Sequence, residues 1–171
     1  PGVMLASAVR DYLVNHAISP GGRTVIVTNN DDAYRTAIAL REARLSVPVI
    51  VDAREEATGP LPQKARSLGL RVATGMAIAE VRGGRRVSGV ALCRHAGEGR
   101  AVLEEVACEA VAMSGGWSPA VHLWSHCGGR LVWDEAGAMF RPDPARPPTS
   151  HDGLPMVIPA GAADGALRAP D

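Results

Sequence analysis

Residues 24–54 constrain the fold more than any other part of the sequence. Thr24 to Thr28 is a short β-branched run of the kind found in parallel strands that are buried on both faces. A helical stretch follows, and a second apolar run, Val47 to Val51, ends at the acidic Asp52. A strand, a helix and an acid-ended strand in this order are typical of the first half of a dinucleotide-binding unit. The sequence therefore predicts an α/β domain built on a parallel sheet.

The turn between this strand and this helix lacks the glycines of a dinucleotide fingerprint. In GxGxxG or GxGxxA the first glycine turns the chain, the second lets backbone N–H groups approach the pyrophosphate, and the third position permits close helix packing. Those positions here are Thr28, Asn30 and Ala33. Ala33 suits the packing, whereas the side chains of Thr28 and Asn30 lie where phosphate oxygens would sit. Asp31 and Asp32 add negative charge at the helix N-terminus, which suits capping and opposes an anion.

Two interpretations of this turn stay open. We favour a structural joint that has lost its phosphate site. In the alternative the turn holds NAD or NADP, with Asp52 on the ribose hydroxyls and Arg54 on a 2′-phosphate. A solvated strand end is the simpler role for those two residues. The candidate cofactor-binding residues are Thr28, Asn29, Asn30, Asp31, Asp52 and Arg54.

The pattern along the chain predicts three parts. Residues 1–22 predict a lead-in helix that ends at two glycines. Residues 23–141 predict a Rossmann-like domain of three layers with a central parallel sheet. Residues 142–171 begin with a run too rich in proline for regular structure, and they predict a linker followed by a partial return segment to a neighbouring domain.

An antiparallel meander interrupts the strand–helix alternation inside the second part. Its three alternating segments are joined by glycine turns, at Gly83-Gly84 and at Gly97-Glu98-Gly99, and they cover 77–81, 87–93 and 101–107. Residues 109–113 then return to a short apolar strand, which breaks at Ser114-Gly115-Gly116 before a helix at 119–127. The predicted order is βαβαβ, a three-stranded meander, a returning strand and a short helix.

Composition excludes several classes of function. Lys and Arg number 18 and Asp and Glu number 18, so the formal net charge is zero and no electrostatic footprint for nucleic acid or an anionic membrane is present. No apolar run approaches the ~18 residues that a membrane span requires. The three cysteines form no CxxC pair, which predicts reduced thiols in a cytoplasm rather than a disulfide framework.

The remaining chemistry-bearing side chains favour structural roles. His122 and His126 share a helix face as zinc ligands do, but no glutamate lies between them and no further ligand completes a site. Cys93 and Cys108 suit small core positions better than nucleophilic ones. We predict no catalytic residue and no metal site. The tryptophans at 117, 124 and 133 favour core packing, with a docking surface as the alternative.

The order of elements resembles the inserted pyridine-nucleotide domain of flavin disulfide reductases. In that superfamily the returning strand ends in a Gly-Arg-x-Pro-Asn type of turn, to which Val111–Leu123 is similar. Ala160-Gly161-Ala162 resembles the Ala-Gly-Asp turn at which the chain re-enters the flavin-type domain, with Ala162 in place of the acid. Four blocks resemble the alpha subunit of heterotetrameric sarcosine oxidase: 1–10, 28–37, 114–123 and 160–165.

This resemblance implies a domain of a larger bacterial oxidoreductase complex. Its parent would oxidatively demethylate sarcosine to glycine, formaldehyde and hydrogen peroxide with FAD, FMN, NAD and tetrahydrofolate. Its partners would be other domains of the alpha subunit and a beta-type flavoprotein subunit. Substrate oxidation and folate binding would lie outside these residues, so we expect a structural or assembly domain. The alternatives are an NAD(P)-binding domain of another flavin-dependent amine or opine oxidoreductase, and a non-catalytic interaction domain.

Overall fold

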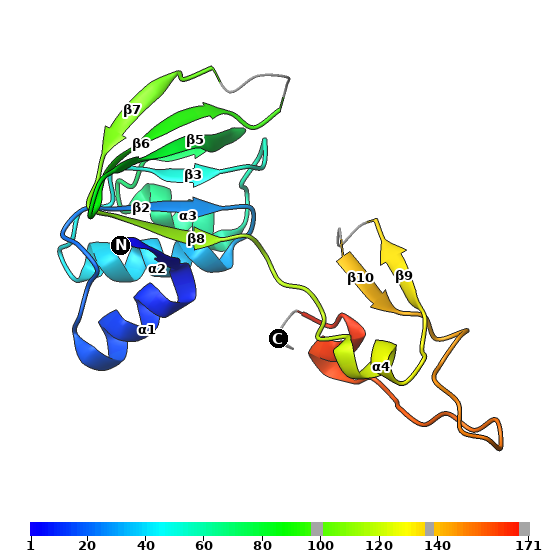
Figure 1. The fold of residues 1–171 in the computed structure, drawn as a ribbon. Helices are drawn as coiled ribbons and strands as arrows, with labels where there is room; N and C mark the ends of the chain where they lie inside the picture. Colours follow the sequence, from blue (N-terminus) through cyan, green and yellow to red (C-terminus); the bar gives the residue numbers. More distant parts are fainter. Residues whose placement is uncertain (97–100, 136–138, 168–171) are drawn as a thin grey trace. The chain divides into compact units, whose positions relative to one another are not determined.

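A computed structural model describes residues 1–96, 101–135 and 139–167 (Figure 1). Its internal contacts divide the chain into two compact units, Pro1–Gly116 and Trp117–Asp171. The division between the units falls after Gly116, at the end of the glycine turn that follows the returning strand. The sequence predicts a boundary later in the chain, between residues 141 and 142. None of the helices in the described ranges is long and apolar enough to cross a membrane.

A five-stranded parallel sheet, in the order β1-β8-β2-β3-β4, forms the centre of the first unit. Its strands are β1 (Val3–Leu5), β2 (Thr24–Thr28), β3 (Ile50–Asp52), β4 (Val72–Thr74) and β8 (Ala110–Ser114). The late strand β8 lies between β1 and β2, with Val111 opposite Val3. At the carboxyl edge Thr28 is level with both Asp52 and Ser114.

Three helices cover one face of this sheet: α1 (Ala6–His16), α2 (Asp32–Glu42) and α3 (Pro60–Ser67) (Figure 1). Ile26 and Ile50 point from the central strands toward the helices, where they pack with Ala37 and Leu40 of α2 and Ala65 of α3. All five side chains are inaccessible to solvent. They belong to the first of two hydrophobic cores in this unit.

A three-stranded antiparallel sheet covers the other face: β5 (Met76–Gly83), β6 (Val87–Arg94) and β7 (Glu104–Ala107). Because successive side chains of a strand alternate between faces, Val25 and Val51 point to this side. They form a second core with Val90 and Leu92 of β6. Helices, parallel sheet and meander make the three layers of the predicted α/β fold class, which is confirmed.

The sequence predicts core positions for Cys93 and Cys108 and two glycine turns in the meander, and the structure tests three of these four predictions. Cys93 and Cys108 are each 3% exposed, so their prediction as small core residues is confirmed. The turn predicted at Gly83-Gly84 joins β5 to β6. The turn predicted at Gly97-Glu98-Gly99 lies outside the described residues.

The opening segment differs from the predicted lead-in helix over residues 1–22. Val3–Leu5 forms an edge strand, and helix α1 begins only at Ala6. The apolar residues at 3, 5 and 9 have helical spacing, but pairing with β8 holds Val3 and Leu5 in an extended strand. Gly2 enters the strand with a φ of 113°, a conformation that glycine adopts without steric cost.

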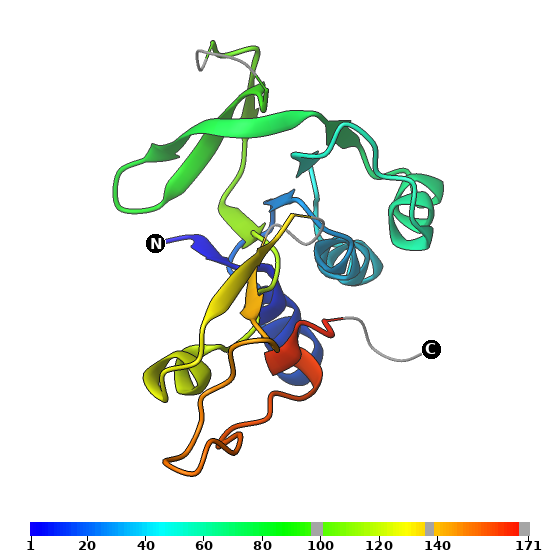
Figure 2. The same cartoon turned by 90° about the vertical axis from the view of Figure 1, so that its right-hand side faces the viewer.

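The second unit contains little regular structure. It has helix α4 (His122–His126), a two-stranded antiparallel sheet of β9 (Leu131–Asp134) and β10 (Met139–Pro142), and a 3-10 helix η1 (Gly161–Asp164) (Figures 1 and 2). Helix α4 is shorter than the helix predicted at 119–127. The indole of Trp124 packs on Gly129, where an added Cβ would lie 2.5 Å from its Nε1. This Nε1 donates a hydrogen bond of 2.7 Å to the carbonyl oxygen of Arg130.

Candidate functional site

The six candidate cofactor-binding residues all lie at the carboxyl edge of the parallel sheet. In open sheets of this type, ligands bind outside this edge. The residues separate there into two groups by their contacts. Thr28, Asn29 and Asn30 bond within their turn and to the end of β8, whereas Asp31, Asp52 and Arg54 bond to one another.

Thr28 closes the turn after β2 with its own hydroxyl. Its Oγ1 accepts a hydrogen bond from the backbone N–H of Asn30 at 3.1 Å and donates one to the carbonyl oxygen of Asn30 at 2.9 Å. The Thr28 side chain is buried at this position. The N–H of Asn30, a group that could otherwise be offered to a phosphate, is therefore bonded inside the turn.

Asn29 and Asn30 connect this turn to the end of β8. The Nδ2 of Asn29 donates to the carbonyl oxygen of Gly115 at 3.0 Å, and the Nδ2 of Asn30 donates to Oγ of Ser114 at 2.9 Å. The Oδ1 of Asn30 accepts a hydrogen bond of 3.1 Å from the backbone N–H of Asp32. The first N–H group of α2 is therefore already bonded to a side chain. Two amides thus occupy positions that a glycine-rich turn leaves open for a pyrophosphate.

Asp52 is completely buried, with 0% exposure, and both of its carboxylate oxygens are bonded. Oδ2 accepts hydrogen bonds of 2.7 Å from Oη of Tyr34 and of 2.7 Å from Nη2 of Arg54. Oδ1 accepts hydrogen bonds of 3.0 Å from both the backbone N–H and Nε of Arg54. The guanidinium therefore binds the carboxylate in a bidentate geometry, which gives strong and oriented ion pairs. A solvated strand end is thus the wrong description of Asp52.

Arg54 also binds a second carboxylate. Its Nη2 lies 2.8 Å from Oδ1 of Asp31, so one guanidinium bridges the turn after β2 and the end of β3. The hydrogen bond to Asp52 is the main cause that raises the pKa of Arg54 above its ordinary value, and desolvation opposes it. The carboxylate of Asp31 also contacts Gly59, where an added Cβ would clash with it. The ion-pair network of Asp31, Asp52 and Arg54 therefore reaches the N-terminus of α3 as well.

Tyr34 is a member of this network that the sequence pattern did not predict. It stands in the first turn of α2 and is fully buried. A buried tyrosine hydroxyl normally has a hydrogen-bond partner, and an acid at the end of the neighbouring strand was the available signal. Burial, followed by the hydrogen bond to Asp52, holds the pKa of Tyr34 well above its ordinary value.

The raised pKa of Tyr34 predicts a loss of stability in alkali. Above pH ~10 the tyrosine of the unfolded chain ionises while the folded chain retains its proton, so the free energy of unfolding falls by up to about 1.4 kcal/mol per pH unit. Urea denaturation between pH 9 and 11, followed by far-ultraviolet circular dichroism, should show a smaller fall for Tyr34→Phe than for the wild type. Tyr12→Phe, on the exposed side of α1, is the matched control and should keep the wild-type fall. Equal slopes in all three proteins would contradict the prediction.

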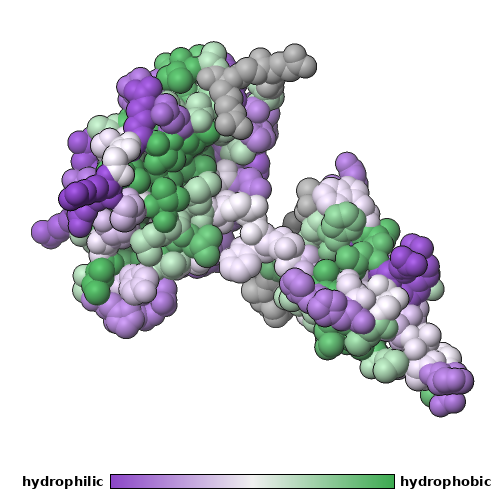
Figure 3. Space-filling model, viewed as in Figure 1, coloured by the Kyte–Doolittle hydropathy of each residue, from purple (hydrophilic) through white to green (hydrophobic). Residues whose placement is uncertain are grey.

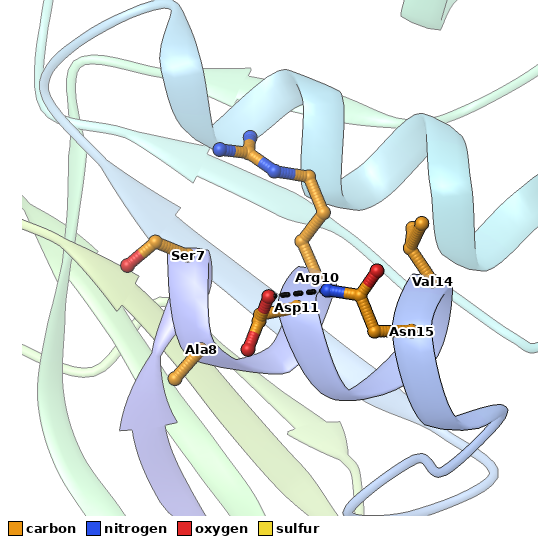
Figure 4. Close-up of a pocket in the computed structure, with 6 residues that line it drawn as sticks. All are labelled: Ser7, Ala8, Arg10, Asp11, Val14 and Asn15. Atoms are coloured by element: carbon orange, nitrogen blue, oxygen red, sulfur yellow. Dashed lines mark hydrogen bonds between the residues drawn. The ribbon is translucent and has the colours of Figure 1, made fainter.

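Other polar side chains lie outside these two groups. A depression on α1 is lined by Ser7, Ala8, Arg10, Asp11, Val14 and Asn15 (Figure 4). Within it Nδ2 of Asn15 donates to Oδ1 of Asp11 at 2.6 Å, and Arg10 extends toward α2, where it pairs with Asp32 at 3.2 Å. His122 and His126 are exposed. Within the described ranges no group of three or more His, Cys, Asp or Glu side chains is arranged to hold a metal ion.

Comparison of the sequence with known proteins identifies relatives of one kind. No family model matches the chain. The sarcosine oxidase subunit alpha of Rhizobium meliloti (strain 1021) is 36% identical over 165 residues, which cover 96% of this chain and 15% of that protein. The subunit of the same name from Corynebacterium sp. (strain P-1) is 36% identical over 149 residues, which cover 85% of this chain and 15% of that protein. The chain thus spans about 15% of the length of these relatives.

Comparison of the fold gives a consistent result. Thioredoxin reductase of T. acidophilum superimposes with a TM-score of 0.61 at 17% identity, covering 95% of this chain and 52% of that chain. A FAD-dependent pyridine nucleotide-disulphide oxidoreductase from Desulfovibrio vulgaris superimposes with a TM-score of 0.54 at 21% identity, covering 80% and 35%. The chain is therefore a relative of the sarcosine oxidase alpha subunits, matching one segment of them, and it has the fold of the NAD(P) domain of flavin disulfide reductases.

Proposed function

We propose that this chain is a structural domain of an oxidoreductase alpha subunit. At the sheet edge that usually binds a dinucleotide, its polar side chains bond to one another instead. The observation that carries the proposal is the binding of Asp52 by Arg54 and Tyr34. The identity of 36% to sarcosine oxidase alpha subunits supports the choice of parent. That parent would demethylate sarcosine oxidatively, with FAD, FMN, NAD and tetrahydrofolate held by other parts of a cytoplasmic, bacterial heterotetramer.

The ion-pair network opposes a dinucleotide on energetic grounds. A ribose that bonded to Asp52 would have to replace Tyr34 or Arg54 as its partner. If Arg54 turned to bind a phosphate instead, the buried carboxylate of Asp52 would be left without a cation. Breaking a buried ion pair costs about 3–5 kcal/mol, which corresponds to a loss of about a hundredfold or more in affinity. A site of ordinary micromolar affinity would then bind only in the millimolar range.

Calorimetric titration of the chain with NAD, NADH and NADP tests this proposal. We expect dissociation constants weaker than about 1 mM for all three, which is a binding free energy of less than about 4 kcal/mol. Thermal denaturation with the same ligands gives an independent measure, because a ligand stabilises the folded state only when its concentration exceeds its dissociation constant. Micromolar binding that is lost in Arg54→Ala would instead establish an NAD(P)-binding domain.

The assembly role has its own test. Other domains of the alpha subunit and a beta-type flavoprotein subunit are the proposed partners. A pull-down with the isolated chain as bait should retain the beta-type subunit. If neither that subunit nor the remainder of the alpha polypeptide is retained, the structural and assembly role fails, whatever the calorimetry shows.

A further inference from the structure

The sequence contains two Asp-Gly pairs, Asp152-Gly153 and Asp164-Gly165, and both lie in the second unit. In such a pair the backbone nitrogen of the glycine can attack Cγ of the aspartate, since no Cβ on the glycine obstructs the approach. Both aspartates are exposed to solvent, and the φ angles of the two glycines are similar, 77° and 89°. A difference in reactivity between the pairs must therefore come from the contacts that hold them.

The first pair lies at the tip of a small hairpin formed by residues 148–156. Three backbone hydrogen bonds of 2.8–3.0 Å join its two sides, from Met156 to Pro148, from Ser150 to Leu154 and from Gly153 to Ser150. The hairpin projects from the second unit as the orange loop in Figures 1 and 2, and Figure 3 shows hydrophilic residues at the tip of this unit. A hairpin of this size is marginally stable by itself, so it opens at little cost.

The buried part of the second unit lies outside this tip. Its buried residues, among those described, are Pro119, Trp124, Gly129, Pro142 and Pro148. The core packing predicted for the three tryptophans is therefore confirmed for Trp124 alone, since Trp117 and Trp133 are exposed. Residues 151–156 are all exposed, so opening of the tip removes no side chain from the core.

The second pair is held more firmly, because its peptide group is bonded at both ends. Nε of Arg141 donates a hydrogen bond of 3.2 Å to the carbonyl oxygen of Asp164, and the N–H of Gly165 donates one of 3.2 Å to the carbonyl oxygen of Ala162. Arg141 also lies against Gly165, where an added Cβ would be 2.6 Å from its Nε. The carbonyl oxygen of Asp152 accepts no hydrogen bond from any residue in the described ranges, so its peptide group is bonded at the nitrogen alone.

We propose that Asp152 is a site of spontaneous isomerisation, at which the folded chain acquires an isoaspartyl linkage, and that the contacts of Arg141 protect Asp164 from the same reaction. The amide nitrogen of Gly153 forms a bond to Cγ of Asp152, and the carboxyl hydroxyl leaves with the amide proton as water. Water then opens the five-membered imide ring. Opening at Cγ restores aspartate, whereas opening at the α-carbonyl carbon leaves the backbone running through the side chain.

The product differs from the original chain in its backbone and in the position of its charge. The isoaspartyl linkage adds a methylene group to the backbone between Asp152 and Gly153 and leaves the α-carboxylate as a side group. The exposed tip presents this carboxylate to enzymes that methylate isoaspartyl residues. The fraction of isoaspartate at position 152 therefore rises with the age of the chain. The reaction needs no cofactor and is independent of the proposed parent complex.

Peptide mapping of the aged chain tests this assignment at both sites in one molecule. The 171-residue chain is incubated at neutral pH, either native or unfolded in guanidinium chloride, and mass spectrometry with electron-transfer fragmentation distinguishes the two linkages at each position. In the native chain we expect isoaspartate to form at least tenfold faster at Asp152 than at Asp164. In the unfolded chain the two rates should agree within about twofold, because the contacts that protect Asp164 are lost.

Three variants separate the chemistry from the contacts. Asp152→Glu keeps the charge but requires a six-membered ring, so no isomerisation is expected at position 152 and the rate at Asp164 should not change. Arg141→Ala removes one of the two anchors of the second pair and should raise the rate at Asp164 at least threefold. Arg146→Ala is the matched control, because Arg146 pairs with Asp143 in the same unit, and it should leave the rate at Asp164 unchanged.

Two results would overturn the proposal. Equal rates at the two sites in the native chain would mean that the contacts around Asp164 give no protection. A native rate at Asp152 more than tenfold below its rate in guanidinium chloride would mean that the hairpin tip protects this pair as well. An isoaspartyl methyltransferase with a labelled methyl donor gives an independent count of the modified sites, and Asp152→Glu should remove most of the label.

Discussion

Replacing Arg54 with alanine is expected to lower the free energy of unfolding of the Pro1–Gly116 unit by about 3 kcal/mol. The change leaves the buried carboxylate of Asp52 with Tyr34 and a backbone N–H but no cation, and it also removes the ion pair with Asp31. Partial exposure of Arg54, at 34%, places the effect at the low end of the range for buried pairs. Urea denaturation followed by far-ultraviolet circular dichroism measures it, since all three tryptophans lie in the other unit.

Two variants separate the buried network from ordinary surface charge. Arg35→Ala removes a guanidinium that is 62% exposed and lies 3.6 Å from Asp32, so we expect a loss of less than about 0.5 kcal/mol. Asp52→Asn combined with Arg54→Ala leaves no uncompensated buried charge, and it should recover part of the loss. A loss below about 1 kcal/mol for Arg54→Ala alone would show that the network contributes little to the fold.

Replacing Leu92 with alanine is the second change with a large expected effect, a loss of about 2–5 kcal/mol. Leu92 is completely buried in β6, where it packs in one cluster with Val51 and Val111 of the parallel sheet. The truncation leaves a cavity between two layers rather than at a surface. We expect urea denaturation to remain a single transition at a lower midpoint, because the meander and the parallel sheet share this core.

The control for Leu92 lies in the same layer. Leu103, which precedes β7, is 57% exposed, and Leu103→Ala should cost less than about 0.5 kcal/mol. Two separate transitions in Leu92→Ala, with the meander unfolding first, would mean that the antiparallel sheet is an appended element with its own stability. A single transition would support one cooperative three-layer unit.

The fold was predictable where local sequence determines it. The β-branched run at 24–28 and the glycine turn at Gly83-Gly84 specify strands and a reversal without reference to distant residues, and the structure has strands at β2, β5 and β6. The strand Val3–Leu5 was not predictable in this way. Val3 and Leu5 share helical spacing with Val9 and carry no strand signal of their own, and only pairing with β8 makes Val3–Leu5 extended.

The candidate site was predictable in position but not in contacts. The ends of neighbouring parallel strands meet at one edge, so Thr28 and Asp52 had to lie near each other. The contacts of the Arg54 side chain were harder to predict. Arg54 binds Asp52, two residues earlier, but it also binds Asp31, and the Tyr34 phenol that bonds the same Asp52 carboxylate comes from α2. The sequence therefore left a phosphate ligand and an internal carboxylate as open alternatives for this guanidinium.

The insertion of β8 between β1 and β2 has a consequence for the order of folding. Val3 can acquire its partner Val111 only after the helices, the first strands and the meander have been synthesised, and until then β2 has no neighbour on that side. Pairings between residues so distant in sequence must overcome a large loop-closure entropy, and they slow folding. During synthesis on a ribosome, the first hundred residues would therefore remain open to chaperones, and closure of the sheet by β8 would be the step that commits the unit to its native state.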